Sequence, residues 1–218
     1  MRVCVVGTGY IGLPTALMLA SHGVHVEAVG HRQETVDKLR RGDVTFEEKG
    51  LPELFSAARE SGNINFRCDY PTEDFYIITV PTPYLADSKK VDATAIVDAL
   101  RHVLAHCADN AVIVVESTIS PGTIDREVRP VVAESGKRVR LAHAPERIIP
   151  GNMLNELIHN SRTIGCDDAA TGEEIKNLYL SFCQGDIVIT DIKTAEMTKV
   201  VENTFRDINI AFANELAK

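Results

Sequence analysis

The 218-residue sequence contains no tryptophan, no long apolar run and no excess of basic residues. A helix that crosses a membrane needs about 20 consecutive apolar residues. Residues 2–6 form a strand pattern that leads into glycines, unlike the apolar centre of a signal peptide. The 31 acidic residues outnumber the 23 basic ones, and the resulting net charge of −8 opposes binding to nucleic acid. We therefore expect a cytoplasmic protein that binds neither membranes nor nucleic acid.

Cysteine is also scarce. The five cysteines are an odd number and include no Cys-x-x-Cys pair, so the sequence predicts neither a disulfide framework nor a bound metal. What is present, 44% apolar and 25% charged residues, is typical of a globular protein. The length fits one large α/β domain, or one domain and part of a second.

Short β-branched runs alternate with helical patterns along the chain. Strands are predicted at 3–6, 24–29, 64–66, 75–80, 111–115, 139–142 and 186–189, and helices at 10–22, 33–41, 51–61, 92–106, 123–134, 168–183 and from 194 onward. Several of these strands are apolar throughout, as strands covered on both faces must be. The order predicts a doubly wound, mostly parallel α/β sheet, as in Rossmann-like dinucleotide-binding domains.

The first strand leads directly into a glycine-rich turn and a helix. In Gly-x-Gly-x-x-Gly, Gly7 permits the tight turn, Gly9 lets the backbone approach a pyrophosphate, and Gly12 lets the helix pack on the strand. The start of the following helix supplies amide donors for the phosphates. The turn therefore predicts a dinucleotide site.

The second strand lacks the acidic residue that usually binds the adenosine ribose of NAD. It ends in Gly30-His31-Arg32. This gap leaves room for the 2′-phosphate of NADP, which Arg32 could bind through its planar guanidinium. The alternative is that Arg32 is a solvated charge and that His31 or the backbone binds the ribose of NAD.

Residues just beyond the strands should lie at the same edge of the sheet as the dinucleotide. Thr82 follows the fourth predicted strand, Glu116-Ser117-Thr118 the fifth, and Glu146 the sixth. Glu146 is a candidate general base, although an ordinary ion pair, for example with Arg147, is an alternative interpretation. His143 is more typical of a hydrogen-bonded structural residue.

The last helix carries two stripes. The apolar stripe, which predicts a core or an interface, is Met197, Val201, Phe205, Ile208, Phe212 and Leu216. The polar stripe is Glu196, Lys199, Asn203 and Arg206. It fits either a solvated face or a functional one, because asparagine is a poor helix former. We expect Thr194 to cap this helix, with Glu196 in its first turn.

Several of these segments occur together in one known family. They are Gly-Thr-Gly-Tyr-Ile-Gly-Leu-Pro-Thr-Ala at 7–16, Val-Pro-Thr-Pro at 80–83, Glu-Ser-Thr at 116–118, Pro-Glu-Arg-Ile-Ile-Pro-Gly at 145–151 and the helical segment at 194–216. The combination resembles the UDP-glucose/GDP-mannose dehydrogenase family across essentially the whole chain. The last two segments are most similar to its UDP-N-acetyl-D-mannosamine dehydrogenase branch.

The resemblance implies oxidation of the C6 hydroxyl of a UDP-sugar to a carboxylate in two hydride transfers to NAD, with a cysteine that holds the intermediate as a thiohemiacetal and then a thioester. It further implies a set of site residues. These are Tyr10, Ile11, Thr82 and Thr118 for the dinucleotide, Arg147, Ile148 and Arg206 for the sugar nucleotide, and Glu146, Lys199 and Asn203 for catalysis. In that assignment Glu146 assists water or proton transfer, Lys199 donates a proton or stabilises an oxyanion, and Asn203 lies beside it.

The sequence departs from the family pattern in two ways. The family's acidic ribose ligand aligns with Gly30, so NADP stays an alternative to NAD. The family's nucleophilic cysteine lies in a Gly-Gly-x-Cys segment that follows a long central helix, and no cysteine here has that context. We thus expect an NAD(P)-binding domain at 1–192 and the first part of a central dimerisation helix at 193–218, without the UDP-sugar domain.

Such a chain is expected to bind dinucleotide without turnover. The sequence leaves two other functions open: part of a UDP-glucose or other nucleotide-sugar 6-dehydrogenase, and a non-catalytic dinucleotide-binding module.

Overall fold

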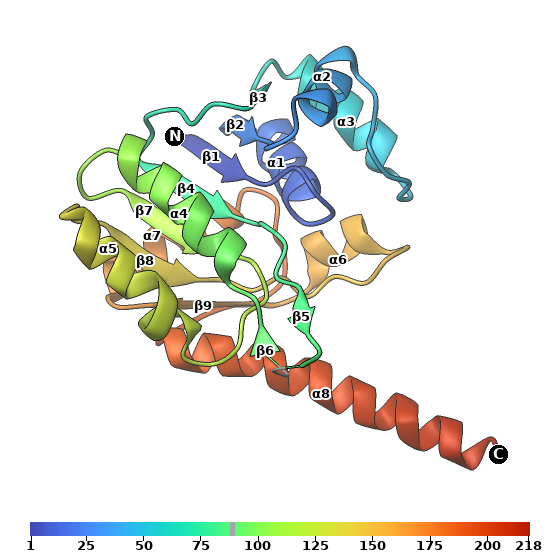
Figure 1. Ribbon diagram of the computed structural model, residues 1–218. Helices are drawn as coiled ribbons and strands as arrows, with labels where there is room; N and C mark the ends of the chain where they lie inside the picture. Colours follow the sequence, from blue (N-terminus) through green and yellow to red (C-terminus); the bar gives the residue numbers. More distant parts are fainter. Residues whose placement is uncertain (88–89) are drawn as a thin grey trace.

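The computed structural model describes residues 1–87 and 90–218, which form one sheet with helices on both faces and a long helix at the C-terminal end (Figure 1). The sheet has eight strands in the order β10-β9-β8-β7-β4-β1-β2-β3. Their bounds are β1 Arg2–Val6, β2 His25–Val29, β3 Ile64–Arg67, β4 Phe75–Ile78, β7 Val112–Val115, β8 Arg140–His143, β9 Arg162–Cys166 and β10 Ile187–Thr190.

All neighbouring strands run parallel except β8 and β9, which are antiparallel. The predicted doubly wound, mostly parallel sheet is therefore confirmed. Strands β4 and β7 are buried throughout, as their apolar sequences require. The change of direction between β8 and β9 has a consequence for the site, because the first residue of β9 lies at the edge where β8 ends.

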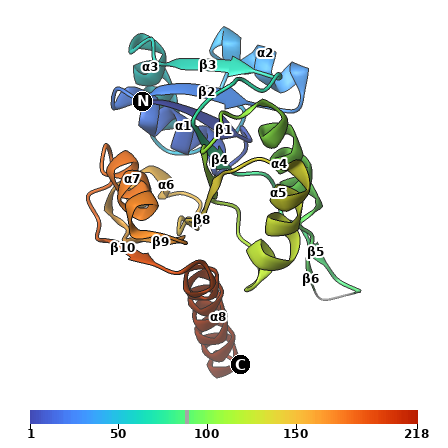
Figure 2. The same ribbon diagram turned by 90° about the vertical axis from the view of Figure 1, so that its left-hand side faces the viewer.

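Two apolar cores fill the space between the sheet and its helices. Side chains such as Val5 and Ile77 contribute to the core on one face, and their chain neighbours Val6 and Ile78 to the core on the other. The helices are α1 Gly12–Ser21, α2 Gln33–Arg41, α3 Leu51–Glu60, α4 Thr94–His106, α5 Arg129–Ser135, α6 Met153–His159, α7 Ala169–Tyr179 and α8 Ile192–Leu216. Helices α1, α3 and α7 cover one face, and α4 and α5 cover the other (Figure 2).

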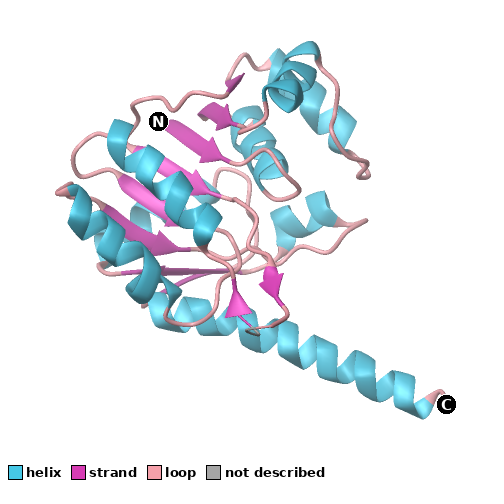
Figure 3. Cartoon of the chain, viewed as in Figure 1, coloured by secondary structure: helices cyan, strands magenta, loops and turns pink. Residues whose placement is uncertain are grey.

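Some elements differ from the sequence-based expectation. Strand β9, the short helix α6, and a hairpin of β5 (Tyr84–Leu85) and β6 (Lys90–Val91) were not predicted (Figure 3). The predicted helix at 123–134 begins with a π-helical turn, η1 (Ile124–Val128), before α5. We attribute that turn to Pro130, which has no amide hydrogen and whose ring would clash with a carbonyl of the preceding α-helical turn.

The long helix α8 begins earlier than expected. Its N-cap is Asp191, which accepts a hydrogen bond from the Thr194 amide (2.9 Å), so the expectation that Thr194 caps the helix was wrong. Glu196 consequently lies beyond the first turn, where it is fully buried. Within the described residues, no helix has both the length and the apolarity that a membrane crossing requires.

The two faces of α8 are reversed relative to an ordinary amphipathic surface helix. Its only buried residues are Ile192, Ala195, Glu196 and Lys199, all within its first eight positions. The apolar stripe is exposed from Met197 to Leu216, so it is not part of the core of this chain. Figure 1 shows the second half of the helix extending away from the sheet.

Candidate active site

The glycine turn is held against two strands. Gly7 adopts a φ of 112°, a conformation that favours glycine, and its amide donates to the carbonyl of Val29 (2.8 Å). The Thr79 hydroxyl donates to the carbonyl of Val6 (3.0 Å) and contacts the carbonyl of Gly7 (3.2 Å). A side chain at Gly12 would collide with the Gly7 carbonyl, whereas the space above Gly9 is open.

The positive φ at Gly7 and the close packing at Gly12 agree with the tight turn and the close helix approach that the sequence predicted, and the open space at Gly9 is compatible with its predicted role. The N-terminal end of α1, with Ile11 at the N-cap, follows the open backbone at Gly9, and its first turn carries no acidic residue. Its unpaired amides and positive dipole end are therefore not neutralised locally. An open backbone next to such a helix start fits the pyrophosphate of a dinucleotide.

The end of β2, where the ribose of the dinucleotide is expected, carries no carboxylate. A Cβ atom at Gly30 would lie 2.8 Å from the Thr8 hydroxyl oxygen and 2.9 Å from a methyl carbon of Val36, so a larger residue here would require one of these side chains to shift. Glu27, on β2, is bound by the Asn65 amide (2.9 Å) and by Arg67 (3.2 Å). His31 and Arg32 are exposed directly after Gly30, which leaves them as the polar side chains at the end of β2.

Two predicted dinucleotide residues lie together on neighbouring loops. The Thr82 hydroxyl donates to the carbonyl of Thr118 (2.7 Å), and the Ser117 hydroxyl donates to the carbonyl of Val80 (2.7 Å). These bonds join the loops that follow β4 and β7. The Thr118 side chain stays exposed.

A buried ionic cluster lies where β7, β8 and β9 meet. Arg162, the first residue of β9, forms ion pairs with both Glu116 (3.1 Å) and Glu146. All three side chains are buried. Glu146 also accepts a hydrogen bond from the amide of Arg147 (2.7 Å).

Aromatic side chains surround this cluster. The Arg162 guanidinium lies 4.3 Å from the ring centre of Tyr179 and 5.5 Å from that of Phe182. The Tyr179 hydroxyl donates to Glu116 (3.3 Å), which also accepts a hydrogen bond from Thr15 of α1 (3.5 Å). Burial raises the pKa of the Glu116 carboxyl, and the positive charge of Arg162 opposes that rise.

Lys199 of α8 lies near this ionic cluster, since α8 packs against β8 and β9. It is 7% exposed, and burial lowers the pKa of its ammonium, an effect opposed chiefly by the negative charge of Glu146. The negative charge of Glu146 thus acts on Lys199, and the sequence had indicated both as candidate catalytic residues. Asn203, one turn further along α8, is half-buried and accepts a hydrogen bond from Arg206 (2.8 Å).

The alternative interpretation of Glu146 as an ion-pair residue is correct, but its partner is Arg162 and not Arg147. The Arg147 side chain forms an ion pair with Glu202 of α8 (2.8 Å) and donates to the Thr163 hydroxyl (2.9 Å). The neighbouring Ile148 is half-buried and packs against the core. The segment at 145–151 is therefore joined to α8 as well as to β9.

His143 is a structural residue in this fold. It is fully buried, and its Nδ1–H donates to the carbonyl of Val115 (2.8 Å). Burial lowers the pKa of the imidazole to about 4. A neutral ring at the end of β8 agrees with the interpretation drawn from the sequence.

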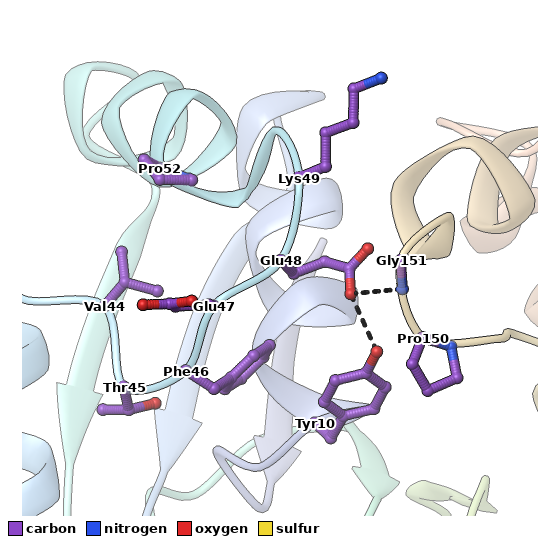
Figure 4. Close-up of a pocket in the computed structure, with 10 residues that line it drawn as sticks. All are labelled: Tyr10, Val44, Thr45, Phe46, Glu47, Glu48, Lys49, Pro52, Pro150 and Gly151. Atoms are coloured by element: carbon purple, nitrogen blue, oxygen red, sulfur yellow. Dashed lines mark hydrogen bonds between the residues drawn. The ribbon is translucent and has the colours of Figure 1, made fainter.

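A cavity of about 730 Å³ lies between the glycine turn and the loop that joins α2 to α3 (Figure 4). Glu48 stands at its wall, where it accepts hydrogen bonds from the Tyr10 hydroxyl (2.9 Å) and the Gly151 amide (3.0 Å). Sequence reasoning identified Tyr10 for the dinucleotide but missed Glu48. One signal could have found it: the acidic pair at 47–48 precedes a Gly-Leu-Pro helix start.

In the described part of the chain, neither the cysteines nor the other potential metal ligands form a metal site. All five thiols are free, and four of them are buried. No three His, Cys, Asp or Glu residues among those at 1–87 and 90–218 are grouped as metal ligands.

Comparison with known families covers almost the entire chain. The model of the NAD binding domain of the UDP-glucose/GDP-mannose dehydrogenase family matches residues 1–183, and the central-domain model of that family matches residues 193–218. The chain is 44% identical to a UDP-N-acetyl-D-mannosamine dehydrogenase of Methanococcus aeolicus over 219 residues, which cover 100% of this chain and 50% of that protein.

Solved structures agree. The UDP-N-acetyl-mannosamine dehydrogenase of Staphylococcus aureus superposes with a TM-score of 0.91 at 43% identity, covering 99% of this chain and 54% of that one. A UDP-glucose dehydrogenase from Pyrobaculum islandicum gives a TM-score of 0.90 at 27% identity, covering 99% and 52%. The chain spans about half the length of the relatives it matches.

Proposed function

Since this chain belongs to the UDP-glucose/GDP-mannose dehydrogenase family, we propose that it is the dinucleotide-binding part of an enzyme that oxidises the C6 hydroxyl of UDP-N-acetyl-D-mannosamine to the uronate. The observation that carries the proposal is the convergence of the glycine turn, Glu146 and Lys199 at one edge of the sheet. The substrate is assigned from the name of the 44% identical relative.

The family's NAD binding domain supports a nicotinamide dinucleotide as cofactor. We assign its pyrophosphate to the backbone at 7–12 with Tyr10 and Ile11, and the rest of the molecule to the loops that carry Thr82 and Thr118. The chemistry that the dinucleotide supplies when bound is acceptance of a hydride. The lack of a carboxylate at Gly30 and the exposed Arg32 close by support NADP, with its 2′-phosphate bound by Arg32, as the alternative cofactor.

The chain's own residues supply electrostatic and proton-transfer chemistry. Lys199 is a fixed cation in a buried setting, which is what a developing oxyanion on the sugar requires. Glu146, held by Arg162, is the carboxylate that assists water or proton transfer. Arg147, Ile148, Asn203 and Arg206 complete the sugar-nucleotide side.

The covalent steps belong to a cysteine outside these residues. Four of the five thiols are buried, and Cys68 follows β3 at the far edge of the sheet. We therefore propose that residues 1–192 form the NAD(P)-binding domain and that the chain alone binds dinucleotide without turnover. Residues 193–218 form part of a central helix through which two copies pair, because its apolar stripe is exposed.

One alternative has specific support. A UDP-glucose dehydrogenase superposes nearly as well as the mannosamine enzyme, so another UDP-sugar is the nearest alternative substrate. Oxidation of a panel of UDP-sugars by the complete polypeptide distinguishes them. A non-catalytic dinucleotide-binding module is the alternative of another class, and oxidation of any UDP-sugar by the complete polypeptide excludes it.

Calorimetric titration of this chain with NAD and with NADP tests the assignment of the cofactor site. We expect Arg32→Ala to weaken NADP binding about tenfold, the loss of one charge-assisted contact, and to leave NAD binding unchanged. Arg41→Ala is the matched control, because Arg41 is an exposed arginine on the neighbouring helix α2.

Equal effects of Arg32→Ala on both dinucleotides would contradict a phosphate site at Arg32. A preference for NAD with no effect of that variant would assign the ribose to His31 or the backbone. Absence of binding to either dinucleotide would contradict the proposed function itself.

A further inference from the structure

One carboxylate connects two segments that are far apart in the sequence. Glu48 lies between α2 and α3 and accepts hydrogen bonds from the Tyr10 hydroxyl (2.9 Å) and from the amides of Gly151 (3.0 Å) and Met153 (3.2 Å). Figure 4 shows its side chain between the Tyr10 ring and the Gly151 backbone. The donors come from the glycine turn on one side and the start of α6 on the other.

On the α6 side of this contact, two hydrogen bonds hold the segment that precedes α6. The amide of Ile149 donates to Glu156 (2.6 Å), and the Asn160 side chain donates to the carbonyl of Arg147 (2.8 Å). The middle of α6 and its C-cap residue are thus bound to the segment that precedes the helix. A displacement of Gly151 therefore moves Arg147 and Ile149 with it.

On the side of the glycine turn, Tyr10 is held by an aromatic contact and by its hydrogen bond to Glu48. The Tyr10 ring packs on Phe46 of the same loop with ring centres 5.1 Å apart, and its hydroxyl is bound to Glu48. The three hydrogen bonds lower the pKa of Glu48, whereas burial and the bond to Glu48 raise the pKa of Tyr10 to about 12. The carboxylate is ionised and the phenol protonated across the neutral range, so the bond persists there.

We propose that Glu48 is a positioning residue that couples the dinucleotide turn to the 145–151 segment. This inference rests on the proposed function, because it takes the turn as the pyrophosphate site. A dinucleotide that fixes the backbone at residues 9–11 also fixes Tyr10, and through Glu48 it restrains Gly151 and Met153. Binding at the turn therefore restrains the segment assigned to the sugar nucleotide.

Hydrogen exchange of the Gly151 and Met153 amides tests the coupling, with NAD as the probe. We expect saturating NAD to slow exchange of both amides at least about fivefold, the lower end of typical coupling between sites. Tyr10→Phe removes only the hydroxyl and keeps the ring on Phe46. The unmodified chain and this variant are compared at NAD concentrations that saturate each of them, and the slowing should be lost in the variant.

Two further variants separate the coupling from general effects. Tyr84→Phe removes a phenolic hydroxyl from the exposed hairpin, so it should retain the NAD-dependent slowing. Glu48→Gln weakens all three bonds and should accelerate exchange of both amides even without NAD.

Each outcome decides a different question. If NAD binds the unmodified chain but leaves both amides unaffected, or if Tyr10→Phe keeps the full slowing, the coupling is wrong while the proposed function stands. If neither NAD nor NADP binds the unmodified chain, the proposed function fails and the coupling fails with it.

Discussion

Lys199 illustrates how much depends on a single buried charge. Its ammonium is removed from water on the inward face of α8, and burial alone would favour its neutral form. The carboxylate of Glu146 opposes that effect. A cation kept in such a place stabilises negative charge far more strongly than one in water.

We expect Lys199→Ala to lower kcat of the complete polypeptide by about 10² to 10³, comparable to loss of an oxyanion donor, with dinucleotide binding little changed. Steady-state kinetics and calorimetry measure the two quantities. Lys193→Ala is the matched control, because Lys193 is an exposed lysine on the same helix. Unchanged turnover in Lys199→Ala would remove the assigned role.

His143 makes stability depend on pH. Burial lowers its pKa from 6.5 to about 4, so the unfolded chain binds a proton more readily than the folded one between these values. Above pH 6.5 the ring is neutral in both states and the shift does not affect stability. As the pH drops from 6.5 towards 4 the shift lowers the free energy of unfolding, in total by about 3 kcal/mol.

Urea denaturation between pH 7.5 and 4 measures this dependence. We expect the midpoint of unfolding to fall less steeply over this range in His143→Gln than in the unmodified chain. The comparison holds at each pH, because the other titrating groups are common to both proteins. Identical slopes would show that His143 is not the group responsible.

At the scale of an element, α8 is attached to the domain by polar contacts as well as by packing. Glu196 is buried, and its carboxylate accepts hydrogen bonds from the amides of Gly122 and of Ile124 (2.9 Å), at the start of η1. A negative charge at that position satisfies amides that have no partner within the helix and interacts favourably with its dipole.

Glu196→Gln replaces one acceptor oxygen by a donor that faces an amide. We expect it to lower the free energy of unfolding by about 1 to 3 kcal/mol and to make α8 more accessible to proteases. Urea denaturation and limited proteolysis measure the two effects. Glu215→Gln, at an exposed position near the far end of α8, should change neither.

The sequence predicted those elements whose signals are local. The turn at 7–12 combines strand, glycines and helix within a few residues, and its geometry is as expected. Arg162 was not predicted, because the sequence-based expectation placed site residues only after the carboxyl ends of parallel strands. Strand β9 runs antiparallel to β8, with His143 opposite Gly165, so the first residue of β9 meets the end of β8.

Two other features had no local signal. Glu48 contacts its partners at positions 10, 151 and 153 only after the chain folds. The orientation of α8 was also open, because two stripes on one helix do not show which of them faces the domain. Glu196 and Lys199 of the polar stripe are buried because the folded domain supplies backbone amides that bind Glu196 and the negative charge of Glu146 near Lys199.

At the scale of the whole molecule, the exposed apolar stripe of α8 is the basis of the proposed pairing of two copies. Contiguous apolar surface of this kind marks an interaction site. A second copy of the chain fits, because helices with apolar stripes at this spacing pack against each other. The side chains are Met197, Val201, Phe205, Ile208, Phe212 and Leu216.

We expect sedimentation to show self-association of the unmodified chain and a monomer for Phe205→Glu combined with Phe212→Glu. The charges would be buried without partners in a paired state, which is costly. Val188→Glu, at an exposed apolar position on β10, is the control and should leave association unchanged. A monomeric unmodified chain at high concentration would contradict pairing.

The attachment of α8 at one end makes it a mechanical lever. The helix has 25 residues and is about 37 Å long at 1.5 Å per residue, of which about 25 Å lies beyond Lys199. A tilt of about 10° at its attached turns displaces the far end by about 4 Å. Because Glu196, Lys199 and Glu202 all lie in the attached part of the helix, a small rearrangement around these charges would displace the exposed apolar stripe by several times its own size.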